Sequence, residues 1–543
     1  MPSLSLTGEN VASRDARARE PADSLSARAR KARAVRPVAR AVVAVASGLA
    51  LAAAFPPYDV YWLMPLGLAG LMAVMPGRRG RAGFGYGLLF GMAFMLPLLR
   101  WITIIGADAW VALSFAEALF YGLMGMSWAW LRRYAWWPVA YGASWVGAEF
   151  LRGTVPFGGL PWGRLAFGLV GTPVIRYGRV GGTALVSLLV VLAVGLVVAA
   201  CTRRRPRTIA ALVGGALVIG LVSAVLPVGA THVDSSVTVA AIQGNVPGQG
   251  MDPFAERRAV LNNHAATTHA FARRVAAGDA PRPDIVIWPE NSTDIDPFSD
   301  ESAYREIDDA VKAIGVPTLV GAVVAGPDPQ HVENMGIVWS PTTGPGERYI
   351  KRHPVPFGEY IPFRSVLTKY IKRLKQIPRD FASGSKPGDL QLGPARIGDV
   401  ICFEVAYDGL VRDVINGGGQ LLVVQTNNAT YTGTGQLEQQ LAISRYRAVE
   451  TGRAVVVAAT NGISAIVAPN GVVEASSPQK TRAVLEEQVP LVSGVTWGVR
   501  DGFWVDLLLS LLALVLTVVA GVRSMSHAGS RLGRRREVDR IRA

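Results

Sequence analysis

Repeated long apolar segments constrain the fold of this chain more than any other feature. A bilayer core about 30 Å thick requires about 20 largely apolar residues in an α-helix. Seven such segments precede residue 233 and one follows residue 502 in the chain of 543 residues. The sequence therefore predicts a polytopic α-helical membrane bundle of about eight spans, at 39–55, 58–76, 82–100, 102–131, 135–151, 182–201, 208–228 and 503–522.

Short basic connections predict how these spans are oriented. Lys and Arg next to a span stay on the cytoplasmic side. Basic residues precede the first span and follow the second, fourth, sixth and eighth, whereas the connections near 56–58 and 229–232 contain none. We therefore expect a membrane protein with both termini in the cytoplasm and residues 233–502 on the extracytoplasmic side. The orienting residues are Arg28, Arg30, Lys31, Arg33, Arg36, Arg40, Arg78, Arg79, Arg81, Arg132, Arg133, Arg203, Arg204, Arg205, Arg207, Arg534, Arg535 and Arg536.

The net charge of +15 suggests nucleic acid at first sight, but its distribution argues against that partner. Residues 233–502 carry 25 basic and 29 acidic side chains, and the rest of the chain carries 30 basic and 11 acidic ones. The excess positive charge thus accompanies the apolar segments and indicates contact with a bilayer, with no nucleic acid expected.

These patterns predict five parts of the chain: a basic disordered cytoplasmic tail at 1–38, a seven-span region at 39–232, an extracytoplasmic domain at 233–502, a last membrane helix at 503–522 and a basic cytoplasmic tail at 523–543. The connection 152–181 departs from the charge rule because it carries four arginines on the predicted outer side. Its aromatic residues suggest an arm on the membrane surface, and a miscounted span is the alternative. Glu117 and Glu149 lie inside predicted spans, where a structural pair and a headgroup or substrate role both remain open.

Short apolar runs alternate with helical patterns from residue 236 onward. This alternation predicts an α/β domain with sheets covered on both faces. We expect strands at 236–243, 284–288, 317–324, 400–405, 420–425, 453–460 and 464–468, and helices at 253–277, 302–314, 408–416 and 436–451.

Polar residues appear abruptly after these apolar runs, where α/β proteins usually build their sites. Glu290 ends Ile-Val-Ile-Trp-Pro-Glu, and Cys402 with Glu404 ends Val-Ile-Cys-Phe-Glu. Cys201 and Cys402 are the two cysteines of the chain, too few for a disulfide framework or a thiolate zinc site. Cys402 is therefore a candidate nucleophile, which needs a cation to favour the thiolate and a base to take its proton. Lys351 and Glu290 are candidates for these two roles.

The motifs around these residues resemble a known family. Trp-Pro-Glu at Glu290, Lys351 ahead of Val-Pro-Phe-Gly-Glu and Ile-Cys-Phe-Glu at Cys402 resemble the Glu-Lys-Cys triad of the nitrilase/carbon-nitrogen hydrolase superfamily. Eight spans around one such domain resemble its membrane-embedded branch, the apolipoprotein N-acyltransferases. Further matching motifs are Ile-Gln-Gly-Asn at 242–245, Thr-Asn-Asn-Ala at 426–429, Arg-Ala-Val-Glu-Thr-Gly-Arg at 447–453, Ala-Thr-Asn-Gly-Ile-Ser at 459–464 and Leu-Pro-Trp-Gly at 160–163.

The resemblance implies a nitrilase-like αββα sandwich, a multi-pass location in the bacterial cytoplasmic (inner) membrane and a transfer of acyl chains. A phospholipid would donate a fatty acyl chain to Cys402 as a thioester, and the α-amino group of a diacylated lipoprotein cysteine would accept it. Glu290 would be the general base, and Lys351 would stabilise the oxyanion with a backbone N–H near Phe403. Glu359 and Glu404 would hold Lys351 and the site geometry. We expect no metal and no cofactor, because the triad already supplies nucleophile, base and cation.

Two other functions remain open from the residues alone. One is a membrane-tethered amidase or nitrilase acting on small substrates, and the other is a non-catalytic polytopic binding or transport protein. His353 offers a Cys-His alternative to Lys351, although the flanking pattern favours the lysine. The basic loop 364–388 is either a lid over the site or a static surface.

Overall fold

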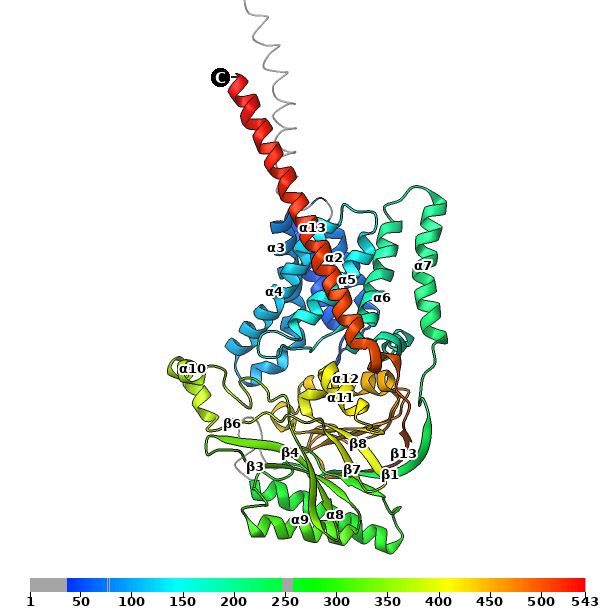
Figure 1. Cartoon of the computed structure of the whole chain (residues 1–543), viewed down its shortest axis with the longest axis vertical. Helices are drawn as coiled ribbons and strands as arrows, with labels where there is room; N and C mark the ends of the chain where they lie inside the picture. Colours follow the sequence, from blue (N-terminus) through cyan, green and yellow to red (C-terminus); the bar gives the residue numbers. More distant parts are fainter. Residues whose placement is uncertain (1–36, 76, 78, 247–256, 543) are drawn as a thin grey trace, which may run out of the picture.

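The computed structural model describes residues 37–246, except 76 and 78, and residues 257–542. The predicted basic tail at 1–38 lies outside the described residues apart from its last two, which begin the helix Pro37–Ala53. The beginning of the predicted helix at 253–277 also lies outside them. Within the described parts, a helical bundle sits above a layered α/β domain (Figure 1).

Helices occupy all eight segments in which membrane spans are predicted. They are the helix Pro37–Ala53, α2 (Leu63–Val74), α3 (Gly80–Leu98), α4 (Ala107–Leu131), α5 (Trp137–Arg152), α6 (Gly178–Ala200), α7 (Pro206–Val225) and α13 (Trp497–Arg542). Among the described residues, five helices are long and apolar enough to cross a bilayer. They are α3, α4, α6 with the helical turn that precedes it (Pro173–Ala200), α7, and the part of α13 at Trp497–Ser526. The membrane bundle is thus supported, while its number of spans stays a prediction. Helix α13 begins before and continues past the predicted span at 503–522, into the predicted tail.

Glycines let α3 and α4 approach closely. A Cβ atom on Gly87 would lie 2.2 Å from the backbone oxygen of Tyr121, and one on Gly83 would lie 2.4 Å from that of Gly125. Small residues allow such contacts between membrane helices, where packing replaces the hydrophobic effect as the main attraction. Buried aromatic residues, including Phe90, Tyr121 and Trp145, fill the adjoining space.

Residues 161–169 of the connection 152–181 are buried in the protein, whereas 154–157 are exposed. The expectation of an arm on the membrane surface is therefore wrong for its central part. Arg152 is fully buried and forms an ion pair with Glu117 at 3.0 Å. Arg164 is 5% exposed and reaches Asp408 of the α/β domain at 3.0 Å. These arginines are retained on the predicted outer side because carboxylates inside the protein pair with them, so the charge rule for exposed loops does not apply to them.

Glu149 has a structural set of contacts. One carboxylate oxygen accepts hydrogen bonds from Trp145 Nε1 and the Leu165 N–H, both at 2.9 Å, and the other accepts one from Ser187 Oγ at 2.7 Å. Glu117 and Glu149 therefore connect the helices to the 152–181 arm, which is the structural reading of these two carboxylates.

The α/β domain contains two sheets packed face to face. In the described residues the first has seven strands in the order β13-β1-β2-β3-β4-β5, with β6 beside β4, and the second has six in the order β12-β11-β10-β9-β8-β7. The first sheet comprises β1 (Val233–Gln243), β2 (Ile285–Ile287), β3 (Thr318–Ala325), β4 (His331–Ser340), β5 (Gly344–Ile350), β6 (Asp380–Phe381) and β13 (Ala483–Val492). The second comprises β7 (Asp389–Leu392), β8 (Ala395–Ile401), β9 (Leu421–Thr426), β10 (Val455–Ala459), β11 (Ala465–Val467) and β12 (Val473–Ser476).

Helices cover the outer face of each sheet, which gives the predicted αββα sandwich. Helices α8 (Arg257–Ala277) and α9 (Glu301–Ile314) pack on the first sheet, on the side away from the membrane bundle (Figure 1). Helices α11 (Asp408–Asn416) and α12 (Gln436–Thr451) pack on the second sheet and face the bundle. One apolar core includes both bundle and domain side chains, among them Trp162, Phe403 and Tyr446.

The structure departs from the predicted elements mainly at strands with mixed composition. Strand β8 ends at Ile401, and Cys402–Ala406 form a 3-10 helix, so the strand predicted at 400–405 is placed too late. Strands β4 and β5 were not predicted because Glu333, Asn334, Glu347 and Arg348 interrupt their apolar runs. These antiparallel strands lie toward the edge of the first sheet.

The basic segment 364–388 contacts the bundle. It contains α10 (Arg364–Tyr370), a 3-10 helix at Lys372–Gln376 and β6. Arg373 forms an ion pair with Asp108, at the beginning of α4, at 2.6 Å. Movement of this segment as a lid stays a prediction.

Candidate active site

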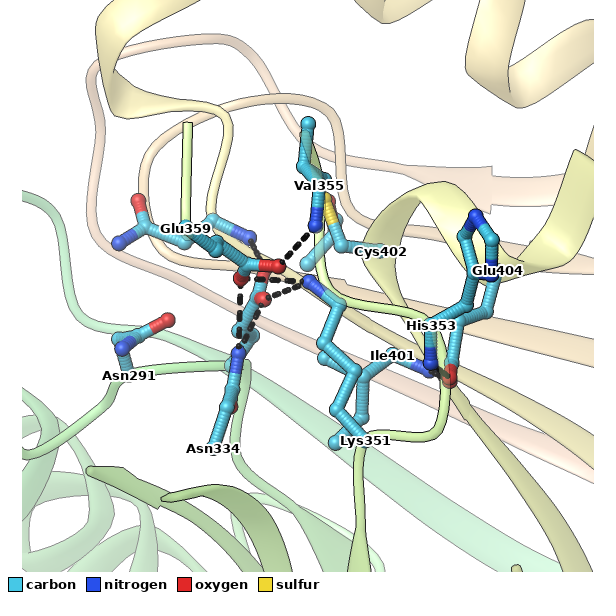
Figure 2. Close-up of polar contacts among 12 residues, drawn as sticks. Asn291, Asn334, Lys351, His353, Val355, Glu359, Ile401, Cys402 and Glu404 are labelled. Carbon is cyan, nitrogen blue, oxygen red and sulfur yellow. Dashed lines mark hydrogen bonds and ion pairs between the residues drawn. The ribbon is translucent and has the colours of Figure 1, made fainter. Parts of the chain in front are cut away.

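Three strands from two facing sheets bring the candidate residues to one place. Glu290 follows β2, Lys351 directly follows β5, and Cys402 directly follows β8. Strands β2 and β8 belong to the parallel parts of their sheets, whose carboxyl ends commonly carry functional side chains. Figure 2 shows Lys351, Glu359 and Cys402 converging on the same space.

Lys351 lies between two carboxylates. Its Nζ is 3.0 Å from Glu290 Oε1 and 2.7 Å from Glu359 Oε1 (Figure 2). Lys351 is 1% exposed and Glu290 is 3% exposed. Burial alone lowers the pKa of this ammonium, but the two carboxylates and Cys402 together raise it well above its ordinary value. Lys351 is therefore a fixed positive charge at neutral pH.

Backbone and amide donors orient the Glu290 carboxylate. Asn334 Nδ2 donates to Oε1 at 2.7 Å, and the Asn427 N–H donates to Oε2 at 2.7 Å. Asn334 Nδ2 also donates to Glu359 Oε1 at 3.3 Å. The backbone carbonyl oxygen of Asn334 accepts a hydrogen bond from the backbone N–H of Lys351 at 2.8 Å. Since each carboxylate oxygen has its own donor, Glu290 keeps one orientation in a buried position.

Cys402 has a protonated thiol at rest. Burial and the negative charge of Glu290 raise the pKa of the thiol to about 12, against the opposing effect of Lys351. The residue has a positive φ of 58° directly after β8. Such a conformation is unusual for a residue with a side chain and costs about 1–3 kcal/mol. Because the thiol is protonated, any nucleophilic attack by this sulfur must be accompanied by transfer of its proton to a base.

Glu404 holds the backbone beneath the site and does not touch the Lys351 ammonium. Its carboxylate accepts hydrogen bonds from the N–H groups of Ile401, Arg352 and His353 at 2.8–2.9 Å and from Tyr349 Oη at 2.8 Å. These donors flank both Lys351 and Cys402. Glu404 thus ties the ends of β5 and β8 together, whereas Glu359 is the direct partner of Lys351.

The environment of the His353 ring differs from that expected of a catalytic base. It lies against Tyr407, with ring centroids 4.1 Å apart, and burial lowers its pKa to about 4, with help from Lys351. Figure 2 shows it on the Glu404 side of the site, away from Glu359. This arrangement favours Lys351 and Glu290 over the Cys-His alternative.

Aromatic side chains form a wall beside Phe403, the residue that follows the thiol. Trp162, from the 152–181 arm, stacks on Phe403, and Trp101 packs against both Trp162 and Tyr431. Burial raises the pKa of the Tyr431 hydroxyl, and so does the negative charge that Cys402 carries when ionised. We call Trp101, Trp162, Phe403 and Tyr431 the aromatic wall. It places membrane-derived apolar surface next to the nucleophile.

Sequence reasoning identified the charged residues of this site and missed their neutral partners. Asn334 lies in β4, an unpredicted strand, and carried no local signal. Asn427 and Thr426 lie in the Thr-Asn-Asn-Ala motif, whose position after a predicted apolar strand offered a signal of the same kind that identified Glu290. Trp162 lies in Leu-Pro-Trp-Gly, a motif that gave no role by itself.

The chain matches two family descriptions. Residues 47–196 match the apolipoprotein N-acyltransferase N-terminal domain, and residues 238–498 match carbon-nitrogen hydrolase. The first match covers most of the bundle and the second covers the α/β domain. The nitrilase-like sandwich expected from the sequence is therefore confirmed.

Individual proteins show the same relationship. An apolipoprotein N-acyltransferase of Mycolicibacterium smegmatis is 38% identical over 91% of this chain and 87% of its own length. One of Shewanella oneidensis is 26% identical over 85% of this chain and 92% of its own. The solved structure of an amidase from Nesterenkonia sp. is 16% identical, covers 50% of this chain and 94% of its own, and has a TM-score of 0.35. The chain belongs to the apolipoprotein N-acyltransferase family.

Proposed function

We propose that this chain moves a fatty acyl chain from a membrane phospholipid, through a thioester on Cys402, to the α-amino group of a diacylglyceryl-cysteine in a lipoprotein. The family relationship supports acyl transfer to lipoproteins. The observation that carries the residue assignment is the contact of Lys351 Nζ with Glu290 Oε1 at 3.0 Å, at the same site as Cys402, whose neighbour in the chain, Phe403, belongs to the aromatic wall.

In the first half-reaction, Glu290 removes the thiol proton as the sulfur attacks the phospholipid ester carbonyl. Lys351 and a backbone N–H near Phe403 stabilise the oxyanion of the tetrahedral intermediate. Glu290 then donates its proton to the leaving oxygen of the lysophospholipid. The product is an acyl thioester on Cys402.

In the second half-reaction, the lipoprotein amine attacks this thioester. The amine loses a proton to Glu290, the C–S bond breaks, and the sulfur recovers a proton. The products are an amide and the free thiol, so the cycle is ping-pong. Glu290 acts as base and acid in turn.

The high pKa of Cys402 couples activation of the thiol to the base. Because the thiol is neutral at rest, the sulfur becomes a strong nucleophile only when substrate and Glu290 are both in place. Glu359 keeps Lys351 in position at 2.7 Å and takes no proton in this scheme.

The proposed placement puts the α/β domain on the extracytoplasmic side, with both termini in the cytoplasm. The basic connections and the bundle above the domain support this orientation. The acyl donor then approaches from the outer leaflet. The exposed ring of Phe157, on the 152–181 arm, contacts the exposed rings of Phe357 and Phe363, and the three add apolar surface.

Neither alternative function is favoured by the family relationship. A small-substrate amidase also has no need for a nucleophile bordered by membrane-derived rings such as Trp162. A non-catalytic binding protein has no need for an ordered carboxylate and ammonium in contact, at the same site as a thiol.

The test is mass spectrometry of the purified protein after incubation with phospholipid. We expect an acyl adduct on Cys402 that disappears when a diacylated lipopeptide is added. Cys402→Ala should give no adduct and no N-acylated peptide. Cys201→Ala is the matched control, since Cys201 is the other, exposed cysteine, at the end of α6, and should leave turnover unchanged. Normal N-acylation by Cys402→Ala would refute the proposed function.

A further inference from the structure

Thr426, the last residue of β9, directly contacts the nucleophile. Its hydroxyl Oγ1 lies 3.3 Å from Cys402 Sγ in donor geometry, and the residue is 1% exposed. The inference drawn from this contact rests on the proposed function, because it concerns how the same sulfur carries charge.

Neighbouring amides restrict where the Thr426 proton can point. Gln440 Nε2 donates to Thr426 Oγ1 at 3.0 Å. In the structure Gln440 Oε1 accepts hydrogen bonds from Gln436 Nε2 at 2.9 Å and from Asn428 Nδ2 at 3.4 Å, which turns its Nε2 toward Thr426. The hydroxyl therefore uses one lone pair for Gln440 and has a single proton left to donate.

That proton has two acceptors within reach. One is Cys402 Sγ at 3.3 Å, and the other is Asn428 Oδ1 at 2.5 Å. A neutral thiol is a weak acceptor, so the amide oxygen is the better partner at rest. A thiolate reverses this preference, because hydrogen bonds to ionised acceptors are about twice as strong as neutral ones.

We propose that the Thr426 hydroxyl is a further catalytic group, a donor that turns from Asn428 to Cys402 Sγ when the sulfur becomes negative, and that Gln440 is its positioning residue. The bond to sulfur is then strongest when charge develops on sulfur, as it does while the thiol attacks and while the thiolate leaves. Interactions that strengthen only in the transition state raise the rate of the chemical step.

The same short segment also holds the base. The Asn427 N–H donates to Glu290 Oε2 at 2.7 Å, and the side chain of the preceding Thr426 reaches the sulfur. Residues 426–428 therefore set the position of base and nucleophile relative to one another. The charged groups that act on Cys402 are Glu290, Lys351 and Glu359, and Thr426 is the neutral donor that assists Lys351.

The test compares Thr426→Val, which keeps the shape and removes the donor, with Thr426→Ser, which keeps the donor and removes a methyl group. We expect Thr426→Val to slow both thioester formation and aminolysis of the preformed thioester by about ten- to hundredfold, the worth of one hydrogen bond to a charged group. Thr426→Ser should recover most of both rates. Thr318→Val, a buried threonine of β3 whose hydroxyl bonds only to the Val316 carbonyl in the described residues, is the control and should match the wild type.

A second readout separates this role from packing. The rate of Cys402 alkylation by iodoacetamide, measured across pH without lipid, reports the thiolate fraction. We expect Thr426→Val to lower the alkylation rate about tenfold at a given pH, which corresponds to a thiol pKa about one unit higher. Thr426→Ser should leave the alkylation rate near the wild-type value. Gln440→Leu should lower the alkylation rate less than Thr426→Val does. Adding Gln440→Leu to Thr426→Val should cause no further decrease.

Equal rates for Thr426→Val and the wild type, equal losses for the valine and serine variants, or an unchanged alkylation profile would each overturn the inference. Additive losses for Gln440→Leu and Thr426→Val would overturn the positioning role of Gln440. These outcomes are distinct from failure of the proposed function, which would appear as acyl transfer by Cys402→Ala.

Discussion

The indole of Trp162 stacks on the ring of Phe403, with centroids 5.3 Å apart and an angle of 8° between the ring planes. Trp162 belongs to the arm between α5 and α6, and Phe403 follows the nucleophile. Trp162 Nε1 donates to Gln439 Oε1 at 2.7 Å, and Gln439 Nε2 donates to the carbonyls of Pro56 and Leu98. The membrane bundle is therefore in direct contact with the turn that carries Cys402.

Trp162→Ala should lower acyl transfer and stability together. Removing a buried indole from a packed core costs about 3–5 kcal/mol, and loss of the stack frees Phe403 next to the nucleophile. We expect a lower unfolding temperature in detergent and at least tenfold slower thioester formation. Trp136→Ala, at the exposed beginning of α5, is the control and should change both little. A full thioester rate in a destabilised Trp162→Ala would show that the stack serves folding only.

Lys351→Arg should abolish measurable thioester formation although the charge is kept. The ammonium fits between two carboxylates at 2.7 and 3.0 Å, a space that a planar guanidinium fills differently. Loss of an oxyanion donor costs about a hundred- to thousandfold in rate. Burst kinetics with phospholipid alone measures this step, with Lys369→Arg, on exposed α10, as control. A rate of thioester formation within threefold of the wild type would mean that Lys351 acts only as a structural cation.

Glu404→Gln should destabilise the α/β domain. The carboxylate accepts from three backbone N–H groups and from Tyr349 Oη, and an amide presents its own N–H groups to some of these donors. We expect a loss of about 2–3 kcal/mol in the free energy of unfolding. Denaturant unfolding measures it, with Glu347→Gln on the exposed part of β5 as control. Equal stability of the two variants would contradict this account.

The sequence predicted the bundle and the layered domain because their signals are long or repeated. Apolar segments of about 20 residues are hard to produce by chance, and the buried parallel strands β9 and β10 consist almost entirely of apolar residues. Strands β4 and β5 have mixed residues because they lie near a sheet edge. Their hydrogen bonds to neighbouring strands, not their own composition, make them strands.

The charged members of the site were predictable, and their geometry was not. Glu290 and Cys402 each follow an apolar run, which marks them in the sequence, and Lys351 was identified from the Val-Pro-Phe-Gly-Glu motif that follows it. The roles of Asn334 and Thr426 depend on contacts across 44 and 24 residues, respectively, that local patterns do not encode. The central part of the arm was misplaced for the same reason, because the partner of Arg164 lies 244 residues away.

Asp399→Asn should stabilise the protein increasingly as pH rises. Asp399 is fully buried in β8, and neither carboxylate oxygen has a hydrogen-bond partner among the described residues. Burial raises its pKa well above the ordinary value, and Glu404 and Glu290 add to this. The folded state therefore holds a proton that the unfolded state releases above its pKa of about 4, so stability falls with rising pH.

Thermal unfolding of the wild type and Asp399→Asn at several pH values between 5 and 9 measures this slope. The difference in unfolding temperature should widen in favour of the asparagine variant toward pH 9, because an amide cannot lose a proton. Asp389→Asn, at the edge strand β7 and paired with Arg396, is the control. A constant or narrowing difference would mean that Asp399 is ionised in the folded state.

Arg164 and Asp408 should show strong energetic coupling between the membrane arm and the α/β domain. Arg164 Nη1 reaches Asp408 Oδ2 at 3.0 Å, and Arg447 Nη2 reaches Asp408 Oδ1 at 2.7 Å while also donating to the Ala406 carbonyl at 2.9 Å. Coulombic attraction from the surrounding arginines, opposed by burial, holds the pKa of Asp408 far below its ordinary value. Breaking such a buried pair leaves an uncompensated charge and costs about 3–5 kcal/mol.

A double-mutant cycle with Arg164→Met and Asp408→Asn tests this coupling. We expect each single variant to lower the free energy of unfolding by several kcal/mol and the double variant to lose much less than their sum, because it buries no unpaired member of this pair. The exposed pair Arg258 and Asp300 serves as control, where a coupling of about 0–1 kcal/mol is expected. Additive losses in the free energy of unfolding for the Arg164 and Asp408 variants would mean that this ion pair does not couple the membrane arm to the α/β domain. Since Arg447 joins Asp408 to the turn after Cys402, the same single variants should also slow thioester formation, whereas the Arg258 and Asp300 variants should not.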